Sequence, residues 1–564
     1  MSTRIMPTRR YVAVALIFLL LILSGIYFYR FSLYSSFASK PQYNVIFIIS
    51  DQEAYKLATV SDYKLPAREE LARKGVTFAH HYAAAAMCSP SRASLLTGVP
   101  PQVHHVFDQE EYSYVPVLDP TRPNMGSVLK QLGYQTAYFG KFEMDKKLLF
   151  PSDTKNYSTL AQPYGFDTFN ADGDVGGQPQ QGYTHDPYFV GEAIRWLRKY
   201  VQSNEQKPFF LVISLLNPHD IMYANANLPN TPQSQHAQYP VIFPPPSNTL
   251  YQKTWHFDLP TSLNQSMVAK GMPAALNQYY QGWSSALGFI PSDRKDMWQF
   301  YYNYYLNAIR DNDQQLQLVI NALNQMDLWK NTIVIFTADH GEMGGAHGGL
   351  RGKGPMAYEE NAHIPLIIAH PEAPKGTTCV ALTSHLDMLP TLIGFTKLSP
   401  SAVKQTIQSY PGYDFSSLVL HPQGAEVNAI RKAVLFNYVG ISTIESKYLL
   451  DTLVSSFSKK PLPPLSQVNL NNRGFLSFVF DGRYKFARFY APNHINTPLT
   501  VDEILKNNDI QLFDLKEDPL EMTNLALNPE KYNQLILHMN ALLNELMEKE
   551  VGKNNLSFLP IMTP

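Results

Sequence analysis

One cysteine in the sequence stands where a helix start could activate a thiol or bind an anion. Ser89 and Pro90 directly follow Cys88 and suit the N-cap and the first position of a helix. Gly98 suits the end of that helix. We therefore predict a short helix that begins just after Cys88. Its free N–H groups and dipole favour negative charge, either a thiolate or a bound anion. A small buried core cysteine is the alternative.

Polar residues with metal-binding or proton-transfer chemistry follow four apolar runs along the chain. These runs are rich in β-branched and aromatic residues, which is typical of strands buried on both faces of a parallel sheet. Ligand sites in such sheets lie at the carboxyl ends of the strands, so we expect the polar endings to meet beside Cys88. The runs are 44–50, 134–139, 209–215 and 332–337, and their endings include Asp51, Gln52, Lys141, Glu143, His219, Asp339 and His340.

Four of these polar residues could hold a divalent cation. Such an ion needs several oxygen or imidazole ligands that converge from different segments of the chain. The candidates are Asp51, Gln52, Asp339 and His340, in two pairs at two different strand ends. An Asp-His pair after a strand can also be a simple turn. The prediction of a metal site therefore depends on the convergence of these residues with Cys88.

Helical segments separate the apolar runs and indicate the fold class. Segments 68–74, 191–201 and 304–326 have helical spacing of apolar residues. Strand–helix alternation predicts an α/β fold in which a large, mostly parallel sheet is sandwiched between helices. Because 564 residues are too many for one simple core, we expect a further, smaller unit.

The chain divides into three predicted parts. Residues 1–40 form an N-terminal stub, membrane anchor and linker, and residues 41–425 form the catalytic domain. Residues 426–564 form a smaller α+β subdomain, because Asp481-Gly482 between two apolar runs indicates a hairpin of an antiparallel sheet and a helix follows over 530–548. Residues 221–300 lack regular pattern, and we interpret them as a rim that shapes substrate access.

The N-terminus predicts a location for the protein. No charge interrupts Tyr11–Tyr29, which is long enough to span a bilayer, and arginines flank it. The basic start places the N-terminus in the cytoplasm and the catalytic domain on the periplasmic or extracellular side. A cleaved signal peptide is the alternative.

Composition excludes some other classes. The formal net charge of −1 gives no sign of a nucleic-acid partner. Only two cysteines occur, so the chain has no disulfide framework, and Cys379 lies in an apolar run that indicates a core position.

The stretch from Cys88 to Gly98 resembles a known motif. It reads Cys-x-Pro-x-Arg followed by Leu-Thr-Gly, which resembles the type I, formylglycine-dependent sulfatases of the alkaline phosphatase superfamily. The resemblance runs from about residue 43 to 548, and the segment 511–525 resembles the closing motif of sulfatase C-terminal subdomains. It implies the sulfatase fold and the oxidation of Cys88 to formylglycine by a formylglycine-generating enzyme.

The resemblance also implies a metal site and site residues. The modified Cys88 would complete the metal shell of the four candidates above, with calcium as the usual ion and magnesium possible. The Gln/His combination also resembles the phosphonate monoester hydrolase branch, in which manganese is plausible. The implied catalytic residues are Cys88, Arg92, Lys141, Glu143, His219 and Lys353, and the implied substrate-binding residues are His347 and Arg351.

The implied reaction is hydrolysis of the sulfate ester of a small molecule or glycan through a covalent step. A hydroxyl of hydrated formylglycine attacks sulfur, His219 protonates the departing alcohol, and a base then releases sulfate. Arg92, Lys141 and Lys353 supply the positive charge that the sulfate group needs. The family usually has a histidine as that base, whereas this chain has Glu143, a weaker base unless burial raises its pKa.

Two other functions stay open at this point. A phosphonate or phosphate ester hydrolase on the same scaffold would need a similar site, because both substrates are tetrahedral oxyanions. An inactive sulfatase-like protein that binds glycans or a partner is the third reading, against which the complete nucleophile and metal positions argue. A phosphoethanolamine transferase is disfavoured, since those enzymes carry threonine at the position of Cys88.

Overall fold

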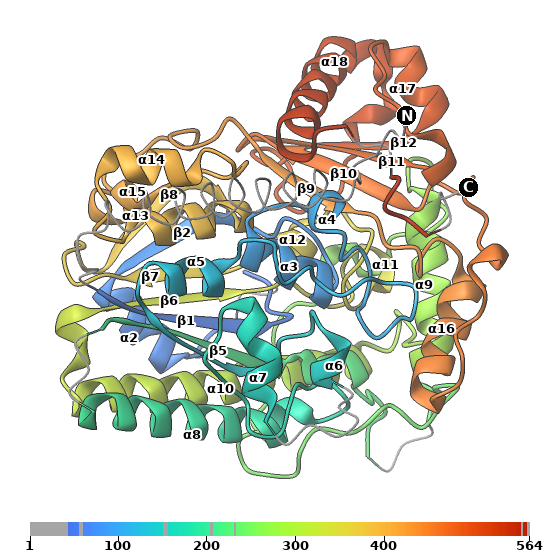
Figure 1. Ribbon diagram of the computed structural model, residues 1–564. Helices are drawn as coiled ribbons and strands as arrows, with labels where there is room; N and C mark the ends of the chain where they lie inside the picture. The colour runs from blue at the N-terminus through green and yellow to red at the C-terminus, as the bar shows by residue number, and fades with distance from the viewer. Residues whose placement is uncertain are drawn as a thin grey trace, which may run out of the picture.

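A sheet of eight strands lies between two helical layers and forms the larger part of the molecule (Figure 1). The computed structural model describes residues 43–55, 60–149, 156–203, 207–229, 233–553 and 556–560. Within the sheet, only β7 runs antiparallel to its neighbours, so the predicted fold class is confirmed. The strands in spatial order are β4 (Thr168–Phe169), β3 (Gln135–Gly140), β5 (Phe209–Pro218), β1 (Asn44–Asp51), β6 (Thr332–Ala338), β7 (Leu366–Ala369), β2 (Val76–Tyr82) and β8 (Thr377–Ser384).

Alternation along the central strand β1 explains the two helical layers. Successive side chains of a strand point to opposite faces. Ile46 and Ile48 pack in the core beneath the sheet, whereas Val45 and Phe47 pack in the core above it. Both faces are therefore apolar, as the continuous run predicted. The lower layer is α2 (Pro66–Lys74), α8 (Gln181–Gln202) and α10 (Lys295–Gln325), and the upper layer includes α3 (Cys88–Thr97), α5 (Met125–Gln131), α13 (Met388–Gly394), α14 (Pro400–Ile407) and α15 (Ser416–Leu420).

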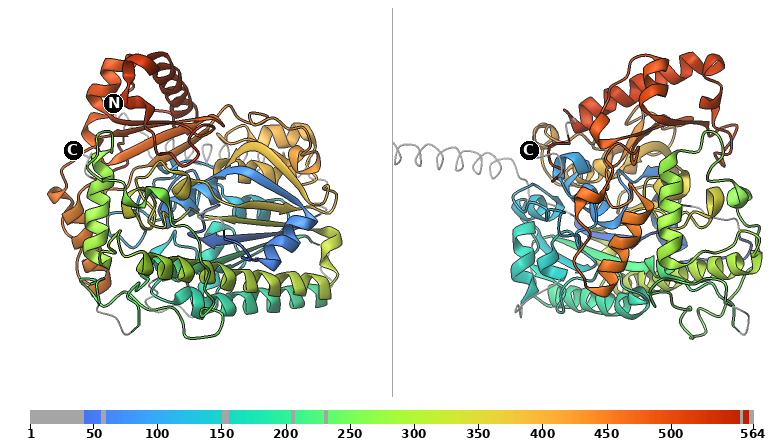
Figure 2. Two further views of the ribbon diagram at one scale, coloured as in Figure 1. Left: turned by 180° about the vertical axis from the view of Figure 1, so that it is seen from behind. Right: turned by 90° about the vertical axis from the view of Figure 1, so that its right-hand side faces the viewer.

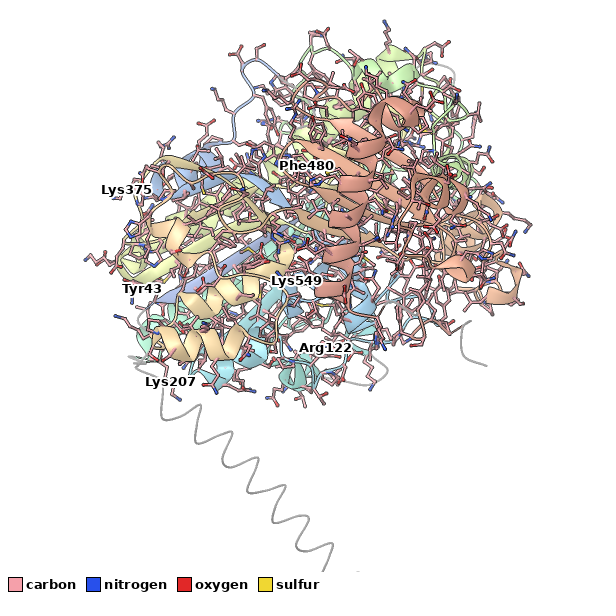
Figure 3. All side chains as sticks on the ribbon, turned by 90° about the horizontal axis from the view of Figure 1, so that it is seen from above. Tyr43, Arg122, Lys207, Lys375, Phe480 and Lys549 are labelled. Atoms are coloured by element: carbon pink, nitrogen blue, oxygen red, sulfur yellow. The ribbon has the colours of Figure 1, made fainter. Side chains whose placement is uncertain are left out.

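A second, four-stranded antiparallel sheet is formed by the C-terminal part of the chain. The predicted hairpin is confirmed: β10 (Phe475–Phe480) pairs with β11 (Tyr484–Tyr490) across Asp481-Gly482. Figure 3 shows Phe480 at the end of this hairpin strand and Tyr43 at the start of the described chain. Other elements of this region include β9 (Val434–Tyr438), β12 (Asp509–Asp514), α17 (Val501–Asn507) and α18 (Pro529–Leu546).

The region 221–300 contains more regular structure than its sequence indicated. Helix α9 (Ala274–Leu287) lies beside α16 (Ser446–Ser458), and both flank the C-terminal sheet (Figure 2). Leu276, Tyr279 and Trp283 line the buried face of α9. Small and aromatic residues make up most of this face, so its helical period was not visible as an aliphatic stripe. The prediction of a patternless rim was wrong for α9.

The predicted membrane anchor needs a correction. Its segment, Tyr11–Tyr29, lies outside the residues that the structure describes. Among the described residues, no helix combines the length and the apolar character required to cross a bilayer. The longest, α10 with 31 residues, is amphipathic because one face covers the sheet. The described structure therefore does not support the predicted localisation, a single N-terminal anchor with the catalytic domain outside.

Candidate active site

Helix α3 presents Cys88 to the carboxyl ends of the central strands. The helix ends at Gly98, which adopts a left-handed conformation (φ +69°), as predicted. Its start differs from the prediction, since Cys88 and Ser89 lie inside the first turn and the N-cap position is Met87. The Ser89 hydroxyl does not cap the helix, because it accepts a hydrogen bond from the Glu110 N–H at 3.0 Å. The 108–111 segment therefore lies directly over the start of α3.

The Cys88 thiol is enclosed and protonated. Its side chain has no exposed surface, and Sγ lies 3.8 Å from Asp51 Oδ1 and 3.3 Å from His340 Nε2. Burial, followed by the Asp51 carboxylate, raises the pKa of Cys88 above its usual value. The effect of burial on the pKa of Cys88 is therefore larger than the stabilisation of a thiolate predicted at the helix start. The position does not favour thiolate chemistry.

Arg92 holds two carboxylates together beside Cys88. Its Nη2 lies 3.1 Å from Asp51 Oδ2 and its Nε lies 3.0 Å from Asp339 Oδ2. Asp51 ends β1 and Asp339 follows β6, so one guanidinium joins the ends of two adjacent strands. Burial alone would raise the pKa of Asp51, but Lys141, with His219 and Arg92, holds it well below its usual value. The Asp51 carboxylate therefore carries charge.

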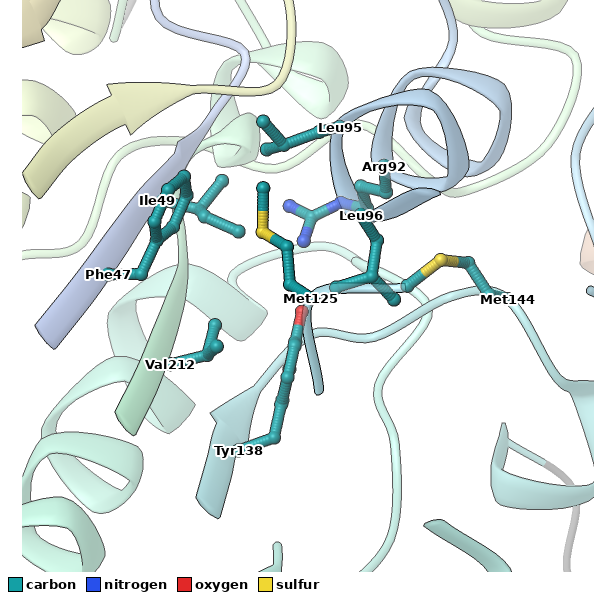
Figure 4. Close-up of a pocket in the computed structure, with 9 residues that line it drawn as sticks. All are labelled: Phe47, Ile49, Arg92, Leu95, Leu96, Met125, Tyr138, Met144 and Val212. Atoms are coloured by element: carbon teal, nitrogen blue, oxygen red, sulfur yellow. The ribbon is translucent and has the colours of Figure 1, made fainter. Parts of the chain in front are cut away.

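An apolar pocket behind Arg92 supports this arrangement (Figure 4). The guanidinium enters from α3 and lies near the Tyr138 hydroxyl, while hydrophobic side chains form the rest of the lining. A charged group in such surroundings requires complete pairing, which the two carboxylates provide. The lining residues are Phe47, Ile49, Arg92, Leu95, Leu96, Met125, Tyr138, Met144 and Val212.

Four donor groups converge as a cation site would require. Ligand atoms of Asp51, Cys88, Asp339 and His340 all lie within 4.8 Å of one another. His340 Nε2 is 3.8 Å from Asp51 Oδ1 and 3.7 Å from Asp339 Oδ1. The other ring nitrogen, Nδ1, donates to the Gly341 carbonyl at 3.1 Å, which leaves the Nε2 lone pair facing the cluster. Burial lowers the pKa of His340 to about 4, so the ring is neutral. This donor set fits a divalent metal ion.

Gln52, the fifth predicted metal ligand, lies beside this cluster and is already hydrogen-bonded. Its Oε1 accepts from Lys353 Nζ at 2.5 Å, and its Nε2 donates to Glu342 Oε2 at 2.5 Å. Glu342 also accepts from the Gly352 N–H, next to Lys353, and from the Tyr301 hydroxyl. Glu342 therefore positions both Gln52 and the loop that carries Lys353.

Lys141 and Glu143 extend from the end of β3 into the same site. Lys141 Nζ lies 2.8 Å from Asp51 Oδ2 and 3.3 Å from Glu143 Oε2. Burial raises the pKa of Glu143 to about 8, although Lys141 acts in the opposite direction. Burial thus gives this carboxylate the basicity that the sequence left open.

His219 completes the group of strand-end residues. It follows β5 and is almost fully buried, and its Nδ1 has no hydrogen-bond partner among the described residues. Burial, and then the positive charges of Lys353 and Lys141, lower the pKa of His219 well below its usual value. The four polar strand endings therefore meet at one edge of the sheet beside Cys88, as predicted.

Gly177 lets the backbone pass close to two of these residues. A Cβ at this position would lie 2.8 Å from His219 Cε1 and 3.1 Å from Lys141 Nζ, and φ is +68°. We expect Gly177→Ala to displace both side chains and lower kcat/KM about 10²-fold, the usual cost of an ångström-scale misplacement. Steady-state kinetics with a chromogenic aryl sulfate would measure this.

The neighbouring glycine supplies the matched control. A Cβ at Gly176 would lie 3.4 Å from the Leu149 side chain, an ordinary contact. Gly176→Ala should therefore keep wild-type kinetics. Equal activity of the two variants, at equal melting temperatures, would show that Gly177 is not part of the site.

His347 and Arg351 lie in the loop between His340 and Lys353. His347 has 1% of its surface exposed, stacks on Tyr358 with ring centroids 3.5 Å apart, and contacts Gln265. Arg351 is also buried and donates to the Gly288 carbonyl. Among the described residues, neither forms a hydrogen bond or ion pair with Cys88, and their substrate-binding role stays a prediction.

Glu111 is a site residue that sequence reasoning missed. It lies in the segment over α3, and burial raises its pKa to about 7, while Lys141 and Lys353 act in the opposite direction. Its Oε2 has no hydrogen-bond partner among the described residues. The only signal in the sequence is a polar Gln109-Glu110-Glu111 run about twenty residues after Cys88. Nothing local shows that this run folds into the site.

Comparison with known proteins finds a matching family model and similar relatives. The family model described as Sulfatase matches residues 43–398, more than half of the chain. An ulvan-active sulfatase from Formosa agariphila is 26% identical over 421 residues, which cover 71% of this chain and 68% of that protein.

Solved structures share the fold. The structure of a 2-O GAG sulfatase superposes with a TM-score of 0.62 at 20% identity, covering 92% of this chain and 94% of the other. The phosphonate monoester hydrolase of Agrobacterium radiobacter superposes with a TM-score of 0.59 at 21% identity, covering 90% and 96%. At these identities the likeness establishes the fold alone.

Proposed function

The chain belongs to the sulfatase family and is a sulfate ester hydrolase, and we propose that it acts through a nucleophile made from Cys88 beside a bound divalent cation. The convergence of Cys88 with Asp51, Asp339 and His340 is the observation that carries this proposal. A buried, protonated thiol is a poor nucleophile, which agrees with modification of Cys88 to formylglycine rather than with direct attack by sulfur.

The metal would be held by Asp51, Asp339 and His340, with the group at position 88 and Gln52 as further ligands. When bound, the ion supplies positive charge that favours ionisation of a neighbouring hydroxyl. Each aspartate places Oδ2 on Arg92 and leaves Oδ1 toward the cluster. Calcium is the ion first expected. Manganese is the second candidate, because transition metals readily accept an imidazole ligand such as His340. Magnesium stays a third option.

The side chains around Cys88 have different proposed roles toward the substrate. Lys141 and Lys353 place two ammonium groups where the oxygens of a sulfate monoester need positive partners. His219, with its free Nδ1, is the proposed proton donor to the departing alcohol oxygen. The positive charges of Lys141 and Lys353 favour the neutral form of the His219 ring. The negative charge of a bound substrate would offset this effect and favour the protonated ring. Glu143 is the proposed base that acts after the alcohol has left.

The substrate is a sulfated small molecule or glycan, and the modification requires a formylglycine-generating enzyme in the host cell. A second candidate function, phosphonate or phosphate ester hydrolysis, has a specific basis. The Asp-Gln and Asp-His pairs resemble the ligands of the phosphonate monoester hydrolase branch, and one such enzyme shares the fold.

Matched aryl substrates would decide between the two functions. The protein, expressed with a formylglycine-generating enzyme, should show a higher kcat/KM for 4-nitrophenyl sulfate than for the corresponding aryl phosphonate monoester. Chelation should remove the activity, and either calcium or manganese should restore it. A reversed preference would favour the phosphonate hydrolase, and turnover of neither substrate by metal-loaded, modified protein would favour a binding protein.

A further inference from the structure

A second group of potential metal ligands lies apart from Cys88. It consists of His347, Glu360 and Glu521, which we call the His347 cluster, and its three ligand atoms lie within 4.8 Å of one another. The three residues come from different parts of the chain: α11 (Ala346–Gly349), α12 (Glu359–Ala362) and the loop after β12. The cluster therefore joins the catalytic part of the chain to its C-terminal sheet.

The His347 ring presents a lone pair to this cluster. Its Nδ1 lies 3.0 Å from Gln265 Oε1, an acceptor, so Nδ1 carries the proton and Nε2 does not. Nε2 faces Glu360 Oε2 at 3.8 Å, too far for a hydrogen bond, and neither atom has a hydrogen-bond partner among the described residues. Two electron-pair donors thus face each other across a short gap, while a second hydrogen bond fixes the ring as in protein metal sites.

Charge around the cluster is unbalanced. Lys485 Nζ lies 2.6 Å from Glu359 and 2.7 Å from Glu521, and this ammonium group serves two carboxylates. Glu360 adds a third carboxylate, with which the lysine forms no ion pair among the described residues.

The surroundings hold the ligands in place and leave one side open. Tyr358 stacks on the His347 ring, and its hydroxyl accepts from Gln511 at 2.8 Å. Glu521 is locked by the Glu359 N–H at 2.8 Å. The Glu360 side chain is 19% exposed, which gives an ion a path from solvent.

We propose that His347, Glu360 and Glu521 bind a second divalent transition-metal ion, such as Zn²⁺, that ties the loop before Lys353 to the C-terminal sheet. One imidazole and two carboxylates form a ligand set that suits Zn²⁺ better than Ca²⁺, which prefers oxygen ligands alone. A zinc ion about 2.1 Å from each ligand holds ligand atoms about 3.4 Å apart, so closure from 3.8–4.8 Å needs only small side-chain rotations. The proposal of this site does not depend on the reaction proposed at Cys88.

Counting bound zinc on the full chain tests the proposal. Protein stripped with a chelator is dialysed against Zn²⁺, and the metal is measured by elemental analysis. Wild type should bind two ions, one in each cluster. The double variant Asp51→Asn/Asp339→Asn, which weakens the cluster at Cys88, should keep one ion. Adding Glu360→Gln to it should lower the remaining affinity at least 10-fold, since even changes to residues outside the metal's own ligands cost 10–100-fold.

The control is the same substitution away from both clusters, Glu372→Gln, which should leave the number of bound zinc ions and their affinity unchanged. Zinc should also raise the melting temperature of the double variant, and Glu360→Gln should abolish that rise. Glu521→Gln repeats the test if Glu360→Gln does not fold. The proposal is overturned if the double variant binds no zinc, or if folded Glu360→Gln or Glu521→Gln protein binds it with unchanged affinity.

Discussion

Cys88→Ala should reduce kcat for an aryl sulfate by about 10⁴-fold or more, the order of magnitude for loss of a nucleophile. No other cysteine can replace it, because Cys379 lies in the core on β8. The fold should survive, since alanine is smaller, favours helices, and removes only long contacts of the thiol with Asp51 and His340. Steady-state kinetics and thermal melting of both proteins would measure the two effects.

The second cysteine offers the same chemical change at a site without a catalytic role. Cys379→Ala should keep the activity of wild type, at some cost in stability from the small cavity. Mass spectrometry of the peptide that contains residue 88 should find an aldehyde in wild-type protein from a competent host. Unchanged turnover by Cys88→Ala would remove the central element of the proposal.

Glu143→Gln should slow only the second half of the reaction. A base that acts after the alcohol has departed leaves the first step intact, so rapid-quench measurements should show a burst of about one equivalent of alcohol. Steady turnover after the burst should be 10²–10⁴-fold slower, the typical loss for a general base. In wild type, kcat should rise as the pH increases through about 8, where Glu143 loses its proton, and the variant should lack this rise.

Two neighbours supply the alternatives to this assignment. If Glu111 is the base instead, Glu111→Gln, not Glu143→Gln, would show the burst. Glu143 lies 3.3 Å from Lys141, and a carboxylate that only orients this lysine would affect the first step. Slow alcohol release without a burst in Glu143→Gln would support that reading and reject the base.

The sequence could predict those strands of the sheet that are covered by apolar side chains on both faces. Strands β1, β3, β5 and β6 lie at the centre of the sheet and appear as continuous apolar runs. The outer strands β2 and β8 mix buried residues with partly exposed ones, and in β8 also exposed ones, and β2 contains two histidines, so no continuous apolar run marks them. Their places depend on tertiary contacts that local pattern does not encode.

The candidate site divides in the same way. Residues at strand ends could be predicted to meet, because parallel strands deliver their carboxyl ends to one edge. Glu111 and Gly177 could not, because they reach the site on loops. The Glu111 loop is fixed by Asp108, which accepts hydrogen bonds from Ser442, 334 positions later in the chain. No window of sequence contains both partners.

The complete enclosure of Cys88 has a consequence for biosynthesis. All ten residues of α3 are buried, and hydrogen bonds from Ser89 and Glu110 close the 108–111 segment over the helix start. A modifying enzyme needs access to an open peptide, and a folded chain exposes such a segment only in rare openings. If Cys88 is oxidised to formylglycine as we propose, its oxidation must therefore precede folding. The fraction of active molecules would then depend on the relative rates of modification and folding of the nascent chain, and a chain that folds first would be modified only in rare openings.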